Sequence, residues 1–240
     1  MSRYPLIVTV FFAVVVTSAL SQTRIGGIVN SYAGVTAISL DCQQTVDLNQ
    51  PLNFLPSGTR VLIIQMKGAS ADAATGAIID RGGAGTFEYA TVAQAVGTRL
   101  VLAAPLRNSY NVAAAVQVVT VPRYTDAIVT STLRAAPWNG SQGGVLALDV
   151  ARTLTLEANI DAGGCGFRGG RRSVNFSAQC GFDAPFVDMA LGVSGERGEG
   201  LSASPPPQNG GRAPWAGGGG GGGGGNGGGG GGGGAGAGGN

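Results

Sequence analysis

The sequence predicts a mainly β protein: a β-sandwich or barrel, followed by solenoid-like strands and a disordered glycine-rich tail. From Val35 to about Ile160, short runs of branched and aromatic residues alternate with glycine, proline, asparagine and serine. This part of the sequence has no sustained apolar period of 3.6 residues, which an amphipathic helix would require. Glycine accounts for 45 of the 240 residues and is concentrated near the C-terminal end.

Residues 1–21 have the anatomy of a secretory signal peptide. An apolar run, Leu6 to Val16, follows a short start that carries Arg3, and Ala19-Leu20-Ser21 supplies small residues for cleavage before Gln22. The alternative is a membrane anchor, but the run is much shorter than the roughly 20 residues that cross a bilayer as a helix. We therefore expect export to the outer cell surface or the medium, with no membrane span after cleavage. Residues 22–34 form a lead segment.

Residues 35–137 are predicted to form the sandwich or barrel. Roughly ten strands over this part and the stretch that follows suit either architecture, and the chain is long enough to bury a core. The clearest strand candidates are Arg60–Met66, Thr86–Val92, Arg99–Ala103, Ala115–Val121 and Asp126–Leu133.

Residues 138–164 are predicted to form a solenoid-like strand pair. After the turn Pro137–Gly140, the apolar residues Leu154, Leu156, Ala158 and Ile160 alternate with polar ones. Two such strands closed by glycines are typical of consecutive β-solenoid rungs. The alternative is an ordinary hairpin that closes the sandwich, because stable stacking needs about three or more units.

The remaining chain is predicted as a loop region (165–200), a proline-containing linker (201–216) and a glycine-rich low-complexity tail (217–240). Glycine runs bury no apolar surface and lose the most entropy on ordering, so disorder is the favoured interpretation. The alternative is a packed array of polyproline-II-like helices, which would need partner strands. The chain stops inside the low-complexity tract, from which we expect a fragment of a longer reading frame.

Three cysteines in an exported chain suggest disulfide bonding. We expect Cys165 and Cys180 to pair, because closing this short loop should contribute about 3 kcal/mol and the enclosed residues are poor in apolar anchors. Cys42 would remain a small buried hydrophobe.

The composition argues against several function classes. The formal net charge is +2 and Lys67 is the single lysine, so we expect no nucleic-acid partner. The absence of histidine removes the usual general base and the commonest metal ligand. The carboxylates are scattered, so we predict no catalytic, metal or cofactor-binding residues and no cofactor. Calcium binding at Asp161 or the Glu196–Glu199 loop is the alternative, although the spacing matches no established calcium loop.

Several stretches carry a resemblance to a known family, among them RVLIIQMKGA from Arg60, AGTFEYA from Ala84, VQVVTVPRYTDAIV from Val116, and the segment that begins WNGSQGGVLALDV at Trp138. Over roughly Val35 to Asn240, the chain resembles the N-terminal region of glycine-rich exported surface proteins of gliding Bacteroidetes-type bacteria. Those proteins commonly end in a gliding-motility-associated or type IX secretion sorting domain. The resemblance implies a structural or adhesin-like surface protein without catalytic residues, with surface glycans or other cell-surface proteins as partners.

A second interpretation is a carbohydrate-binding or polysaccharide-degrading extracellular β protein. Its distinguishing feature would be a groove lined by aromatic platforms. The candidates are Phe87, Tyr89, Tyr110, Tyr124 and Trp138, although packing in the core would also account for most of them.

Overall fold

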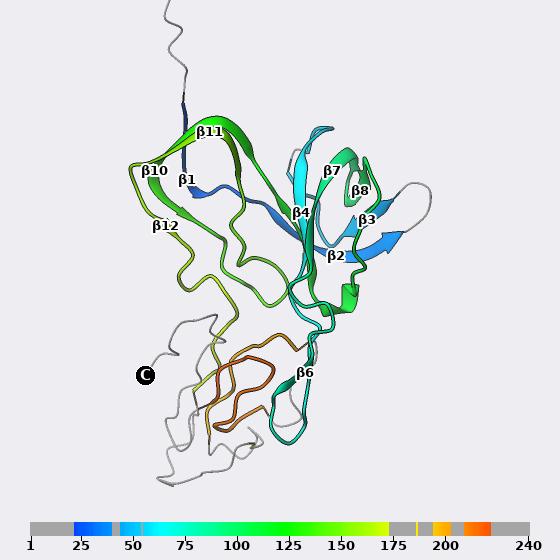
Figure 1. The fold of residues 1–240 in the computed structure, drawn as a ribbon, viewed down its shortest axis with the longest axis vertical. Coiled ribbons are helices and arrows are strands. Elements are labelled where there is room, and N and C mark those ends of the chain that lie inside the picture. The colour runs from blue at the N-terminus through cyan, green and yellow to red at the C-terminus, as the bar shows by residue number, and fades with distance from the viewer. Residues whose placement is uncertain are drawn as a thin grey trace, which may run out of the picture.

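The computed structural model describes residues 22–39, 44–53, 55–172, 186, 194–202 and 209–221. These residues contain twelve β-strands, one 3-10 helix (Val112–Ala114) and no α-helix, so the predicted mainly β class is confirmed. The strands form a closed barrel, a parallel sheet and a small hairpin (Figure 1).

Six antiparallel strands close the barrel, which decides between the two predicted architectures. In barrel order they are β2 (Tyr32–Ser39), β3 (Thr45–Leu48), β8 (Arg99–Leu102), β7 (Phe87–Val96), β4 (Arg60–Gln65) and β9 (Val116–Thr120). The strand candidates that begin at Arg60, Thr86, Arg99 and Ala115 correspond to β4, β7, β8 and β9. The first and last barrel strands along the chain, β2 and β9, pair with each other, so the chain enters and leaves the barrel side by side.

The period of two along β4 separates two cores. Val61 and Ile63 point into the barrel, where they pack with other fully buried residues such as Val46, Leu100 and Val118. Leu62 points outward and packs in a second cluster with Tyr32, Val119, Val121 and Ala147. This second cluster is covered by the connection that follows residue 134.

Buried amide side chains fix that connection to the barrel. Gln117 is fully buried; its Nε2 donates to the Gly143 carbonyl at 3.0 Å, and its Oε1 accepts from the Gly143 amide at 2.8 Å. Asn30 bonds both the carbonyl and the amide of Ala147 in the same way. Each amide replaces a backbone partner, so no buried polar group of the connection is left unpaired at these points.

The second sheet is parallel. It contains β1 (Thr23–Ile28), β10 (Arg123–Arg134), β11 (Asp149–Leu156) and β12 (Ile160–Asp161), with β10 in the centre. Both β11 and β12 pair with β10, in registers such as Arg123 with Asp149 and Leu133 with Ile160. Its core contains Ile25, Ala127, Val129 and Leu133. The sheet therefore joins a strand of the lead segment to strands from residues 123–161.

For residues 138–164 the structure shows strands, and their solenoid-like character stays a prediction. This stretch contains β11 and the two-residue β12, which lie along β10 and not against each other, so the described residues do not form the alternative hairpin there. Leu154 packs in the core, but Leu156 and Ile160 are 57% and 44% exposed. The reason is position: β11 lies at the edge of the sheet, and no further strand among the described residues covers these side chains.

Among the described residues beyond β12, pairing is limited to isolated bridges, such as Glu196 with Gly210, and no further strand is formed. Segments 194–202 and 209–221, orange to red in Figure 1, lie beside the hairpin of β5 (Ser70–Ala71) and β6 (Ile78–Asp80). The amides of Gly68 and Ala69 both donate to the Leu201 carbonyl, at 2.8 and 3.0 Å, which fastens this part to the barrel. Most of the predicted tail, residues 222–240, lies outside the described residues, as do Cys42 and Cys180.

Candidate functional site

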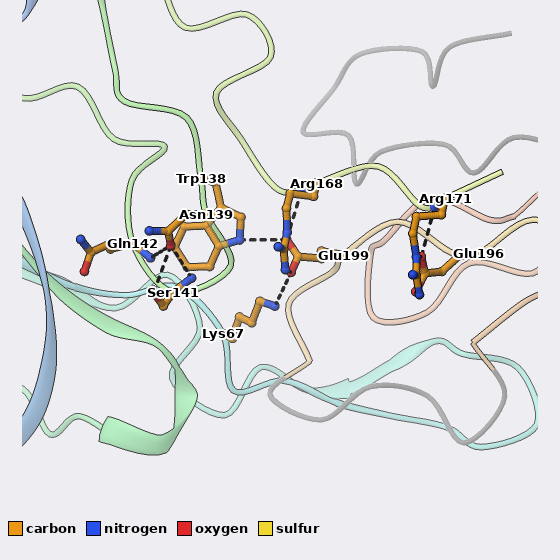
Figure 2. Close-up of polar contacts among 9 residues, drawn as sticks. All are labelled: Lys67, Trp138, Asn139, Ser141, Gln142, Arg168, Arg171, Glu196 and Glu199. Carbon is orange, nitrogen blue, oxygen red and sulfur yellow. Dashed lines mark hydrogen bonds and ion pairs between the residues drawn. The ribbon is translucent and has the colours of Figure 1, made fainter. Parts of the chain in front are cut away.

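A charged cluster around Glu199 brings together four segments that are distant in sequence (Figure 2). Lys67 follows β4, Trp138 lies in the connection after β10, Arg168 follows Cys165, and Glu199 belongs to segment 194–202. The side chains of Lys67 and Glu199 are 15% and 19% exposed. The cluster therefore lies where the barrel meets the C-terminal segments.

Both oxygens of the Glu199 carboxylate accept hydrogen bonds. Oε1 accepts from Arg168 Nη2 at 2.7 Å and from Lys67 Nζ at 3.5 Å. Oε2 accepts from Trp138 Nε1 at 2.8 Å and from the Arg168 backbone amide at 3.1 Å. Four donors thus converge on one carboxylate, and two of the donating groups carry positive charge.

The protonation of Glu199 follows from these contacts. Burial alone would raise the pKa of its carboxyl, but the hydrogen bonds from Arg168 and the charges of Lys67 and Arg168 outweigh burial and lower the pKa to about 2. The group is therefore ionised at neutral pH and its acceptor positions are engaged. Such a carboxylate is suited to hold chain segments together and poorly suited to exchange protons with a substrate.

The turn at Trp138 is shaped by its own sequence. Asn139 Oδ1 accepts from the backbone amides of Ser141 and Gln142, both at 3.0 Å, which closes an Asx-type turn (Figure 2). Gly140 has a φ of +107°, and a Cβ there would lie 2.6 Å from Arg168 Nη2. The positive φ favours glycine at this position, and the missing Cβ leaves room for the Arg168 guanidinium.

Aromatic rings complete the cluster. Phe167 packs edge-on against Trp138 with their ring centroids 5.3 Å apart. The Lys67 ammonium lies 5.5 Å from the Phe167 ring centroid and 5.9 Å from that of Trp138, within cation–π range.

A second ion pair repeats the arrangement three residues along each segment. Arg171 Nε donates to Glu196 Oε2 at 2.7 Å, and the hydrogen bonds from Arg171 lower the pKa of Glu196. Arg168 and Arg171 thus face Glu199 and Glu196 in antiparallel order. This matched spacing of three is visible in the sequence and is the signal that points to the cluster.

The candidate calcium ligands are occupied by basic residues and backbone amides. Asp161 accepts from Arg134 at 2.8 Å and from the Gly163 amide at 2.8 Å, while Glu196 and Glu199 belong to the ion pairs above. Across the described ranges, no group of three or more histidine, cysteine, aspartate or glutamate residues is placed to hold a metal ion.

Cys165, half of the predicted disulfide, is buried at the base of the same region. Its thiol is free among the described residues and donates to the Ala135 carbonyl at 3.3 Å. Cys180 lies outside the described residues, so the pairing of Cys165 with Cys180 stays a prediction.

Two of the five candidate aromatic residues expose their rings. Phe87 and Tyr89 are 55% and 49% exposed on the outer face of β7, with ring centroids 6.4 Å apart in an edge-to-face contact. The Arg60 guanidinium lies 4.3 Å from the Tyr89 ring centroid and pairs with Asp149 at 2.9 Å.

The other three aromatic candidates are engaged inside the structure. Tyr110 donates its hydroxyl to Glu88 at 3.0 Å, Tyr124 packs against the core of the parallel sheet, and Trp138 is 3% exposed.

Comparison of the chain with protein-family models, with curated proteins and with solved structures finds no match. Within the described part of the chain, no helix is long and apolar enough to cross a membrane.

Proposed function

We propose that this chain is an exported cell-surface or extracellular structural protein of adhesin-like type, without catalytic activity. The observation that carries the proposal is the set of contacts that the charged side chains make. Those of the Glu199 cluster are engaged with one another and join distant segments into one body. Side chains that hold distant segments together suit a protein with a structural role at a surface. The signal-peptide anatomy and the resemblance to exported surface proteins support the same function.

The parallel sheet supports a solenoid-like contribution to this role. Arg123 pairs with Asp149, 26 residues further along the chain, and Leu133 pairs with Ile160, 27 residues further along. A nearly constant offset between parallel neighbours is what one turn of a coil produces. We propose that β10 and the β11–β12 edge are two successive rungs.

Location on the cell tests the first proposal. Antibodies against the barrel should label intact producing cells or the medium, and mass spectrometry of the mature protein should find an N-terminus near Gln22. A chain that retains Met1 and occurs only in the cytosol would contradict the proposal. Beads coated with the mature chain should also adhere to the surface of the producing cells more strongly than uncoated beads.

Carbohydrate binding is the second candidate function, and the exposed Phe87–Tyr89 pair favours it. Exposed aromatic rings offer apolar faces, and Arg60 and Asp149 beside them supply hydrogen-bonding groups. A glycan array probed with the mature chain tests this function. Binding that is lost in Phe87→Ala but kept in Val96→Ala would support it, because Val96 is a 63% exposed residue at the other end of β7.

A further inference from the structure

The parallel sheet has an open edge on each side. Among the described residues, β1 and β11 each pair with β10 alone, so β1 forms one edge and β11, continued by β12, forms the other (Figure 1). An edge strand presents backbone amides and carbonyls that can pair with a further strand. Both edges of this sheet are therefore surfaces to which another strand can be added.

The backbone of Leu156 faces outward at the β11 edge. The amide of the next residue, Glu157, donates to the Val129 carbonyl at 3.0 Å and so points toward β10. Because successive residues of a strand turn their backbone groups to opposite sides, the amide and the carbonyl of Leu156 point away from β10.

Apolar rows of the sheet core reach this edge and stop there. Ile25, Val129 and Leu156 lie in one row across the three strands, with exposed fractions of 7%, 0% and 57%. In a second row, Leu133 is fully buried and its partner Ile160 is 44% exposed. A strand added at the β11–β12 edge would remove Leu156 and Ile160 from water, which favours its addition.

Strand direction and spacing fit β1 of a second copy as the added strand. All pairs in the sheet are parallel, so β1 of a second copy beside β11 would continue the sheet without a change of direction. The step from Leu156 to Ile160 along β11–β12 equals the step from Val129 to Leu133 along β10, with which β1 already pairs.

The side chains fit in that register. Ile25 of the second copy would lie beside Leu156, and its Gly27 would lie beside Ile160. A Cβ built on Gly27 meets no atom within 4 Å, so the space next to it is open within one copy. The Ile160 side chain of the neighbouring copy would have room there.

The two edges are complementary in charge. Arg24 on β1 and Glu157 after β11 are exposed, and neither takes part in an ion pair among the described residues. In the same register, Arg24 of the second copy would lie beside Thr155, two residues from Glu157 and on the same face of the sheet. Diagonal neighbours at this spacing are within reach of long side chains.

We propose that β1 of one copy adds in parallel to the β11–β12 edge of the next, so that copies of this chain associate head to tail. The two contact surfaces differ, so the association continues into an open fibre and does not close at a dimer. The strand β1 has six residues, so a single contact is small and association should need a high concentration. Assembly of this kind depends on the sheet and not on the surface role proposed above.

Sedimentation equilibrium of the mature chain, from Gln22 to Asn240, tests the association. Up to about 1 mM, the range of weak contacts, the weight-average mass should rise beyond that of a dimer. A chain that stays monomeric over this range would overturn the proposal. A mass that levels off at the dimer would also overturn it, because two copies would then have closed on each other through identical edges.

Hydrogen exchange identifies the edge that is covered. The amide of Leu156 should exchange at least about tenfold more slowly at the highest concentration than in the monomer, because pairing with a second copy satisfies it. Protection of this amide that is already complete in the monomer would overturn the proposal, since another segment of the same chain would then cover the edge.

Charge reversal tests the register. Arg24→Glu and Glu157→Arg each bring like charges together between copies, and each should lower the association constant at least about tenfold. The double variant restores opposite charges and should recover the association constant to within about threefold of the wild type. Arg81→Glu is the matched control, because Arg81 is exposed directly after β6 and the substitution makes the same change in net charge.

The outcome of the charge reversal is decisive in either direction. Arg24 and Glu157 are exposed and unpaired among the described residues of one copy, so substituting them should leave the fold of the single chain unchanged, as urea unfolding of the dilute protein would verify. Association that is unaffected by both single variants, or that does not recover in the double variant, would refute the proposed pairing. An equal loss in Arg81→Glu would refute it as well, because net charge alone would then control the association.

Discussion

Glu199→Gln is the most informative single substitution. Glutamine keeps the size of the side chain but removes its charge and replaces one acceptor oxygen by an NH₂ group. If the NH₂ group takes the place of Oε1, Arg168 Nη2 and Lys67 Nζ lose their acceptor. If it takes the place of Oε2, Trp138 Nε1 and the Arg168 backbone amide lose theirs. We expect the contact between the barrel and segment 194–202 to weaken while the barrel strands remain folded, because the barrel core does not include this residue.

The magnitude follows from the protonation of Glu199. Its pKa is lowered from an ordinary value of 4.5 to about 2. At 1.36 kcal/mol per pKa unit, this corresponds to an upper limit of about 3.4 kcal/mol for the interaction of the charged form with its surroundings. The Arg168 side chain is 57% exposed, so solvent screens the pair and we expect a loss of about 1–2 kcal/mol.

The pH dependence has a defined sign. A carboxyl whose pKa is lower in the folded state stabilises that state above its unfolded pKa, and this contribution disappears as pH falls through the folded value. The difference between the wild type and Glu199→Gln should therefore be complete at pH 7, shrink below about pH 4.5 and be mostly lost at pH 2.

Urea unfolding and limited trypsin digestion measure the effect. At pH 7, the variant should lose the free energy given above and be cleaved faster after Arg168 and Arg171. Glu157→Gln is the matched control, because Glu157 is exposed and its carboxylate takes no part in the ion pairs of the described residues. Equal stability of the two variants at pH 7, or a difference that persists unchanged at pH 2, would show that the charge of Glu199 does not hold these segments.

Three further predictions test other parts of the structure. Gly170→Ala should open segments 166–172 and 194–202 to proteolysis, because its Cβ would overlap the Glu196 carbonyl. Gly166→Ala should not, because a Cβ there meets no atom within 4 Å, and similar digestion of both variants would contradict the packing argument. Gln117→Leu should lower the free energy of unfolding by about 1–3 kcal/mol, since it leaves two buried backbone groups unpaired, and an unchanged urea midpoint would contradict this. Peptide mapping without reduction should recover Cys165 linked to Cys180; a free Cys165 thiol in the purified protein would show the pairing to be wrong.

The strands of the barrel were predictable because local patterning determines them. The run RVLIIQM, for example, contains β-branched residues and has turn residues on both sides. Strand β4 covers Arg60–Gln65, all of this run except its last residue. The choice between barrel and sandwich was not predictable, because it depends on which strands pair at long range. The pairing of β10 with β1 was not predictable for the same reason, because it joins residues about a hundred positions apart.

The candidate site was harder to predict than the fold. Lys67 was noted only as the single lysine, and Glu199 only as a possible calcium ligand. Each is unremarkable alone, and the cluster exists because the tertiary fold brings four segments together. For residues 217–221 of the predicted tail, the contacts with other segments were missed for a different physical reason. Composition shows that such residues bury no side chains, but it does not show that their backbones pack against one another.

The parallel pairing of β1 with β10 has a mechanical consequence. The whole barrel lies between these two strands in the sequence, yet they lie side by side in the sheet. A pulling force between the start of β1 and the end of β10 acts on opposite ends of two parallel strands, so it loads their hydrogen bonds together in shear. While that pair holds, tension passes through the sheet and bypasses the barrel. The barrel would keep its shape under a load that stretches the rest of the chain.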